Sequence, residues 1–101
     1  MRKTGKSIHR SEFKVAIRCL VEIREKAGIT QMDLAAKIKR TQTFVSAAER
    51  GIRRVDIVQL RDITHACGTD LVAFSRMLEE GIARMSAPVA AAKNPPRKGT
   101  R

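Results

Sequence analysis

The chain has 101 residues, enough for one small domain, and its 21 Lys and Arg against 10 Asp and Glu give a formal net charge of +11. This charge favours a polyanionic partner, while 3% aromatic residues, with no Trp or Tyr, argue against RNA modules and single-strand grooves that stack bases on aromatic rings. No segment has the roughly 20 apolar residues of a membrane span. The two cysteines lack CxxC spacing, which suggests free thiols in a reducing compartment, so we expect a cytoplasmic protein.

Both ends of the chain are basic and poor in large apolar residues. Residues 1–10 are polar, and residues 87–101 contain four basic residues and no acidic one. We therefore expect flexible basic tails over 1–10 and 87–101, which flank a single folded domain over 11–86.

Apolar residues at helical spacing, bounded by capping residues and glycines, predict a series of short helices. Ser11 is expected to cap the first helix, which Gly28 ends. Thr30 and Asp33 form a capping-box pattern that opens the second helix, from 31 to about 38.

Similar capping residues and glycines occur further along the chain. Thr41 is expected to cap a third helix over 42–50, and Asp56 with Gln59 opens a fourth that ends at Gly68.

A fifth helix begins after Thr69 or Asp70 and continues from Leu71 to at least residue 80. No segment alternates with a period of two, so strands are not expected. The sequence predicts an all-α domain of five short helices.

The second and third helices are joined by only three residues, Lys39 to Thr41. Such a short connection forces a steep crossing, as in a helix-turn-helix, whose second helix enters the major groove of DNA. Basic residues are concentrated around this segment, with Glu49 as the sole acid between residues 37 and 54: Lys37, Lys39, Arg40, Arg50, Arg53 and Arg54. This coincidence predicts a helix-turn-helix at about 31–50 with a phosphate-binding surface.

These residues resemble the phage repressor/Cro-like, Xre-type helix-turn-helix proteins from about Leu20 to Leu78. The resemblance is carried by seven short segments: Ile23-Arg24, Gly28-Ile29-Thr30-Gln31, Asp33-Leu34-Ala35, Gln42-Thr43-Phe44-Val45-Ser46, Glu49-Arg50-Gly51, Arg53-Arg54-Val55-Asp56 and Ala66-Cys67-Gly68-Thr69. It implies a compact lambda-repressor-like domain that binds double-stranded DNA.

The resemblance also implies roles for individual residues. The candidates for reading bases, which the resemblance places on the third helix, are Gln42, Thr43, Ser46 and Ala47. The candidates for binding phosphate are Gln31, Lys39, Arg50, Arg53 and Arg54. Arg24 and Glu49 match a buried ion pair that joins the first helix to the third. Four positions depart from the family pattern: Lys39 replaces a small residue or Gly, Arg40 an apolar residue, Ala47 a long polar one, and Ala48 a larger apolar one.

The fifth helix carries an apolar stripe that includes Leu71, Phe74, Leu78 and Ile82. One interpretation is that these residues cover the core of their own domain. The stripe also runs past Gly81, which favours an interface and makes a homodimer our preferred interpretation, since two recognition helices match a palindromic operator.

No combination of residues indicates an enzyme, a cofactor or a metal site. His65 and Cys67 are the only close pair of metal-ligand types, and two ligands do not make a zinc site. We therefore expect a sequence-specific regulator, a repressor acting on a palindromic operator as a dimer.

Three alternatives remain open at this point. An antitoxin would bind a toxin partner while repressing its own operon, a protein-interaction module would retain the fold without reading bases, and a non-specific nucleic-acid coat would use the two basic tails.

Overall fold

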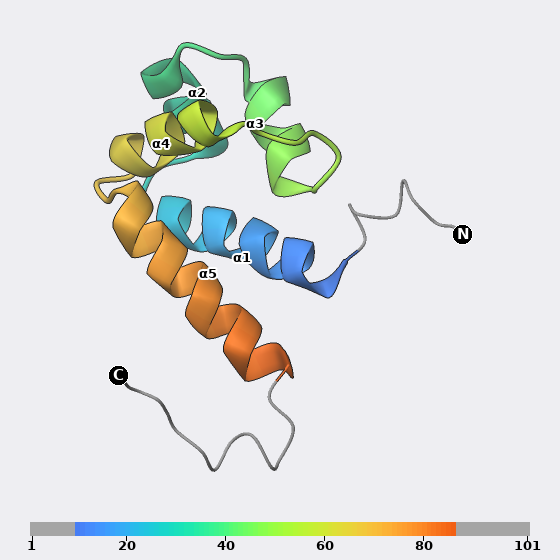
Figure 1. Ribbon diagram of the computed structural model, residues 1–101. Helices are drawn as coiled ribbons and strands as arrows, with labels where there is room; N and C mark the ends of the chain where they lie inside the picture. Colours follow the sequence, from blue (N-terminus) through green and yellow to red (C-terminus); the bar gives the residue numbers. More distant parts are fainter. Residues whose placement is uncertain (1–9, 87–101) are drawn as a thin grey trace.

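The computed structural model describes residues 10–86, and the predicted tails at 1–10 and 87–101 lie almost wholly outside them. Five helices follow one another (Figure 1): α1 (Ser11–Lys26), α2 (Gln31–Ile38), α3 (Gln42–Glu49), α4 (Ile57–Ala66) and α5 (Leu71–Ser86). No strand occurs within the described part, so the expectation of an all-α fold of five helices is confirmed. None of these helices is long and apolar enough to cross a membrane.

The helix starts follow the capping chemistry in the sequence. The Thr30 hydroxyl accepts from the Asp33 N–H at 3.0 Å, and the Asp33 carboxylate accepts from the Thr30 N–H at 2.9 Å. These bonds satisfy N–H groups at the start of α2 that have no partner inside the helix. Asp56 and Gln59 form the same reciprocal box at α4.

One helix start differs from the expectation. Ser11 is the first residue of α1, and Arg10 occupies the N-cap position without a side-chain cap; Arg10 instead bonds to Glu12 at 3.2 Å. The last helix, α5, is expected to reach at least residue 80, and it continues to Ser86. The cap of α5 is Asp70, whose carboxylate accepts from the Ala73 N–H at 2.9 Å.

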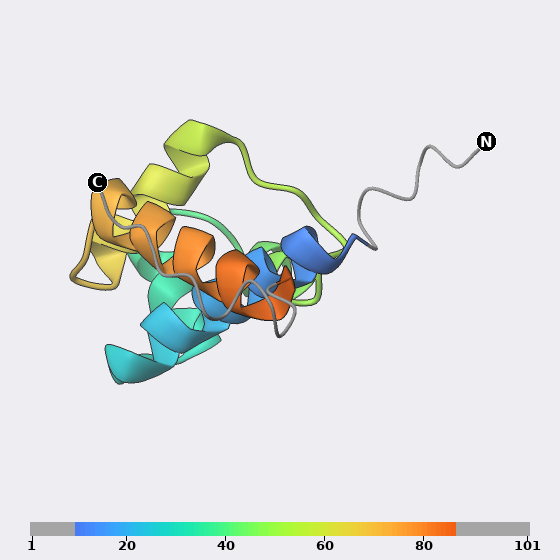
Figure 2. The ribbon, with the colours of Figure 1, turned by 60° about the horizontal axis from the view of Figure 1, so that its bottom comes forward.

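The helices pack around one core in which α1 is central. Its buried residues Val15, Cys19, Leu20 and Ile23 face the core side chains of the other four helices. Helices α2, α3 and α4 lie on one side of α1, and α5 crosses α1 on another (Figures 1 and 2). Burial raises the pKa of both cysteine thiols, Cys19 and Cys67, which are unpaired by any disulfide.

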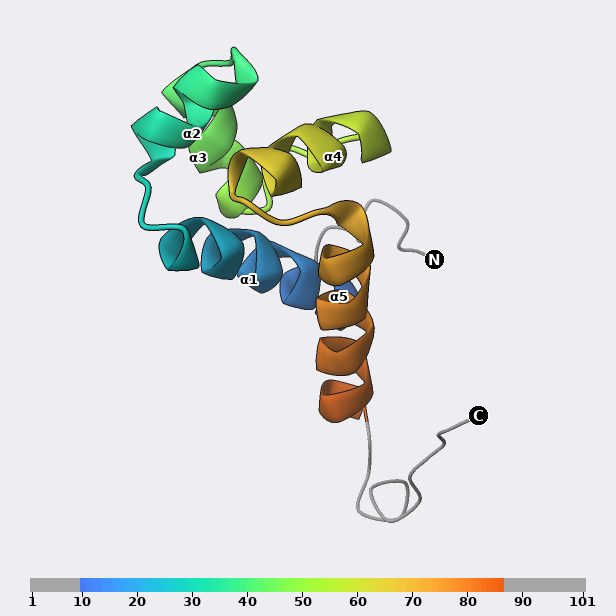
Figure 3. The same ribbon diagram turned by 90° about the vertical axis from the view of Figure 1, so that its left-hand side faces the viewer.

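The crossing of α1 and α5 depends on a glycine within α5. An ideal Cβ built at Gly81 would lie 2.7 Å from Cγ1 of Val15, closer than real Cβ contacts allow. Val15 is 3% exposed and β-branched, so its side chain has little freedom to move away. Beyond this contact, the last turns of α5 project past α1 (Figure 3).

We expect Gly81→Ala to destabilise the protein, although alanine favours helix over glycine by about 1 kcal/mol. Overpacking against Val15 costs about 1–3 kcal/mol and outweighs that preference, so the thermal midpoint should fall by about 5 °C. Ser75→Ala, at an exposed position of the same helix, is the control and should change it little. A midpoint that rises in Gly81→Ala would show that α1 and α5 are not in close contact.

Candidate nucleic-acid interface

The turn between α2 and α3 fixes which face of α3 is exposed. Lys39 ends α2 in the left-handed conformation with φ at 59°, so the chain reverses within two residues. Thr41 then caps α3 by accepting from the Phe44 N–H at 3.0 Å. Phe44 and Val45 turn inwards and are buried against the core.

The other side of α3 carries the predicted base-reading residues. Gln42 and Thr43, in the first turn, are exposed, while Ser46 and Ala47, one turn later, are half-buried. Residues four apart on a helix lie on the same face, so Gln42 with Ser46 and Thr43 with Ala47 form two adjacent rows. The structure therefore brings these four residues together on one surface.

An ion pair connects α3 to α1 beneath this surface. Nε of Arg24 lies 2.6 Å from Oε2 of Glu49, and Nη2 lies 3.0 Å from Oε1, so the guanidinium and the carboxylate meet at two points. The side chains are 13% and 7% exposed. Nη1 of Arg24 also donates to the Ile29 carbonyl at 2.9 Å, which ties in the α1–α2 loop. The hydrogen bonds with Glu49 raise the pKa of Arg24 above its ordinary value.

This ion pair extends outwards through two glutamines. Nε2 of Gln31 donates to Oε1 of Glu49 at 3.0 Å, and Oε1 of Gln31 accepts from Nε2 of Gln42 at 3.4 Å. The sequence suggested Gln31 as a phosphate contact, whereas in the structure both ends of its amide bond to protein groups. Gln31 thus links the buried carboxylate to the exposed amide of Gln42.

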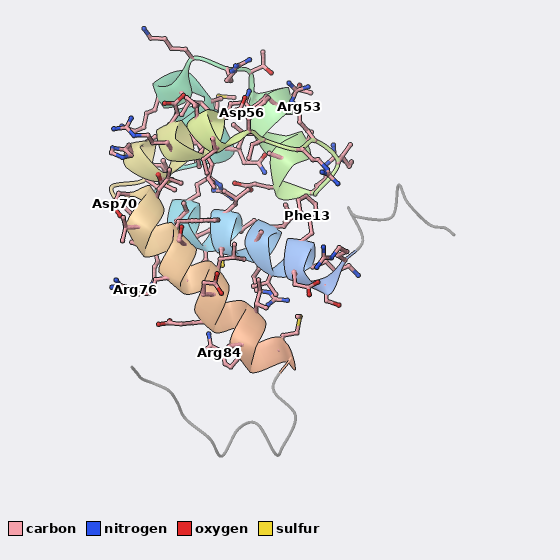
Figure 4. The ribbon with its side chains drawn as sticks, in the orientation of Figure 1. Phe13, Arg53, Asp56, Asp70, Arg76 and Arg84 are labelled. Carbon is pink, nitrogen blue, oxygen red and sulfur yellow. The ribbon has the colours of Figure 1, made fainter. Side chains whose placement is uncertain are left out.

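Aromatic rings hold three of the basic residues. Arg40 and Arg53 lie over the ring of Phe44, with their Cζ atoms 5.2 and 4.9 Å from its centroid. Arg54 lies over Phe13 of α1 at 5.7 Å. Figure 4 shows Arg53 near α3 and Phe13 on α1, on the same side of the molecule. Cation–π contacts of this kind limit the motion of long side chains and stabilise the contact modestly.

Arg40 belongs to the basic cluster seen in the sequence, but it was not among the individual candidates for binding phosphate. It stands where the resemblance leads one to expect an apolar side chain, and Phe44 four residues later was the signal that could have explained it. Its stem and guanidinium cover the aromatic ring while the residue remains exposed.

The basic residues border an open groove beside α3. The groove measures about 1240 Å³, and its lining includes Lys39, Arg40, Thr43, Ala47, Arg53 and Arg54. Arg50 lies outside it, at the end of α3, where its Nε donates to the Ser46 carbonyl at 3.4 Å. Four of the five predicted phosphate-binding residues therefore flank the exposed face of α3, and Gln31 is the exception.

The predicted interface stripe of α5 divides into two groups. Phe74 is 3% exposed and belongs to the core of its own domain, so its assignment to an interface is corrected. Leu71, Leu78 and Ile82 are half-buried. Met85, which the sequence places on the same stripe, and Val72, which it places beside the stripe, are 41% and 66% exposed.

Among residues 10–86 there is no cluster of three His, Cys, Asp or Glu side chains with the arrangement of a metal site. His65 is exposed and Cys67 is buried.

The comparisons with known proteins agree with this geometry. A family described as "Helix-turn-helix domain" matches residues 18–77. An Xre-family-like protein from Pseudomonas syringae pv. tomato str. DC3000 is 39% identical, with a TM-score of 0.67, over 75% of this chain and 93% of that one. The wild-type restriction-modification controller protein C.Esp1396I is 30% identical, with a TM-score of 0.67, over 72% of this chain and 96% of that one. No curated protein sequence matches the chain.

We expect Glu49→Ala to unfold a large fraction of the protein near its growth temperature. The change leaves the largely buried charge of Arg24 without its carboxylate partner. We expect this to lower the free energy of unfolding by about 3–5 kcal/mol, which is a large part of the stability of a domain this small. Glu25→Ala, at an exposed position of α1, is the matched control. Thermal unfolding followed by circular dichroism measures both, and a Glu49→Ala midpoint within 2–3 °C of wild type (about 0.5 kcal/mol) would contradict the account.

Proposed function

Because this chain belongs to the Xre-type helix-turn-helix family of DNA-binding transcriptional regulators, we propose that it is a repressor that occupies a palindromic operator as a homodimer. The family and the fold are those of DNA-binding regulators and not of enzymes. The observation that supports sequence reading most directly is the hydrogen-bonded connection from the buried ion pair through Gln31 to Gln42.

In this proposal Gln42 reads an adenine in the major groove. An amide nitrogen has two hydrogens, so Nε2 of Gln42 can bond to Gln31 with one and to adenine N7 with the other. Its oxygen then accepts from adenine N6, which completes the two-point contact typical of Gln and adenine. Because Gln31 already orients the amide, less side-chain entropy is lost when DNA binds.

The neighbouring residues of α3 complete the reading surface. Thr43 and Ser46 have hydroxyls that can serve several bases, and the methyl groups of Thr43 and Ala47 suit the methyl group of thymine. The small side chain of Ala47 leaves the bottom of the groove open for the edge of a base.

The cations around the groove bind the DNA backbone. Lys39, Arg40, Arg53 and Arg54 line it, and Arg50 lies at the end of α3. These residues contribute charge without sequence information, since phosphates are the same at every base pair.

We expect Gln42→Ala to weaken binding to the preferred duplex by about 1–3 kcal/mol, with little effect on a random duplex, because it removes one base contact. Replacing both Arg53 and Arg54 with Ala should weaken binding to both duplexes and lower the salt slope by about one unit for each lost phosphate contact. Titrations of each variant on both duplexes at two salt concentrations measure these effects.

A double replacement of Arg76 and Arg84 with Ala is the matched control, since it removes the same charge from exposed positions of α5 (Figure 4). It should change both affinities less than the Arg53 and Arg54 replacement does. Equal weakening of both duplexes by Gln42→Ala would make Gln42 a phosphate contact. Unchanged binding in all variants would mean that α3 does not face DNA.

The dimer in this proposal forms through α5. Val72 and Met85 are exposed apolar residues on this helix, and the half-buried Leu71, Leu78 and Ile82 lie along it. Exposed apolar area of this kind favours an interface, and a two-fold axis would relate two copies of α3 as the half-sites of a palindrome are related.

We expect Val72→Glu to lower the mass measured by sedimentation equilibrium from that of a dimer to that of a monomer. A buried carboxylate without a partner is strongly unfavourable at an interface, and operator affinity should fall with it. Val58→Glu, at an equally exposed valine on α4, adds the same charge and should leave the dimer intact. A dimer that persists in Val72→Glu would place the interface elsewhere.

A further inference from the structure

A small apolar cavity lies between α1, the end of α3 and α5. It measures about 220 Å³, and its walls include Phe13, Ile17, Leu20, Ala48, Leu60 and Phe74. Most of its walls are apolar side chains, which offer a water molecule few hydrogen-bond partners. Cavities of about 150 Å³ with similar walls bind benzene, so this one has room for an organic molecule.

The cavity has an origin in the sequence. Ala48 is 2% exposed and ends in a single methyl group, where the resemblance leads one to expect a larger apolar residue. The space that a larger side chain would fill remains open between α3 and α1. At the usual packing density of about 0.75, it suits a molecule of about ten non-hydrogen atoms.

Two arginine residues border this apolar space. Arg53 and Arg54 line the cavity, and both also line the groove beside α3. No acidic residue is among the residues that line the cavity. A ligand that fits therefore combines an apolar body with one anionic group at the arginine end.

We infer that this cavity is a binding site for a small apolar carboxylate, such as an aromatic or medium-chain acid, which acts as an effector. The apolar body occupies the space beside Ala48, and the carboxylate bonds to Arg53 and Arg54. The effect on DNA rests on the proposed function, in which the same two arginines bind phosphate. Because the carboxylate and the phosphate compete for them, the ligand lowers DNA affinity, and DNA lowers ligand affinity by the same factor.

Phenylacetate, which has ten non-hydrogen atoms, is the probe, and its neutral isostere phenylacetamide and plain acetate are the controls. With DNA-free protein, phenylacetate at ten times its dissociation constant should raise the thermal midpoint by about 5–10 °C. Phenylacetamide should bind more weakly and acetate not detectably. Equal binding of phenylacetate and phenylacetamide, or no binding of either, would overturn the inference.

Substitutions locate the binding. Ala48→Leu and Ala16→Leu fill the cavity from α3 and from α1, and each should abolish the shift caused by phenylacetate. Two variants are needed because either one can overpack the core. Ala83→Leu, on the exposed side of α5, should retain the shift of the thermal midpoint caused by phenylacetate. A shift that persists in a folded filled variant would place the probe outside the cavity.

Removal of the two cations tests the role of the charge. With Arg53 and Arg54 both replaced by Ala, the preference for phenylacetate over phenylacetamide should disappear while the amide still binds. A preference that persists would exclude the arginines as carboxylate ligands.

Competition with a duplex tests the coupling to DNA. Saturating phenylacetate should weaken wild-type binding to a random duplex about tenfold, and an unchanged affinity would overturn the coupling. Because the probe titrations use DNA-free protein, they give a result even if the protein does not bind the duplex. Failure of the cavity site and failure of the proposed function are therefore distinguishable.

Discussion

The contact between Arg24 and Glu49 is the interaction on which the arrangement of the interface depends. It joins α1 to α3 at two hydrogen bonds, and Arg24 also bonds to the carbonyl of Ile29 before α2 begins. Helix α1, the loop before α2 and helix α3 are thereby fixed relative to one another. A buried ion pair adds little net stability compared with apolar packing, so its contribution here is geometric: it sets the orientation of α3.

The same principle continues to the surface, where side chains that would be flexible in water are held by protein groups. Gln31 orients Gln42 through a hydrogen bond, and both Arg40 and Arg53 lie over the ring of Phe44. Ordering long polar side chains in the free protein reduces the entropy that binding must overcome. In this small domain, the carboxylate of Glu49 and the ring of Phe44 hold most of the ordered side chains of the interface.

Sequence reasoning identified the helices and the caps Thr30, Thr41 and Asp56, because periodicity and capping are local properties of the chain. The four candidate residues on α3 came from the resemblance to the Xre-type family. Sequence reasoning did not identify the role of Gln31, whose partners lie 11 and 18 residues away, or the stacking of Arg40 on Phe44. Phe74 was assigned to an interface because a helical stripe does not reveal which of its members a neighbouring helix covers. The cavity beside Ala48 also depends on how three helices meet.

The central claim is that the exposed face of α3 reads the sequence of double-stranded DNA. The most direct measurement is selection of bound sequences from a pool of random duplexes by the wild-type chain. The account predicts enrichment of a palindromic consensus whose half-sites lie about one helical turn apart, with an adenine at a symmetric pair of positions. A pool that shows no enrichment, although the protein binds it, would contradict the account.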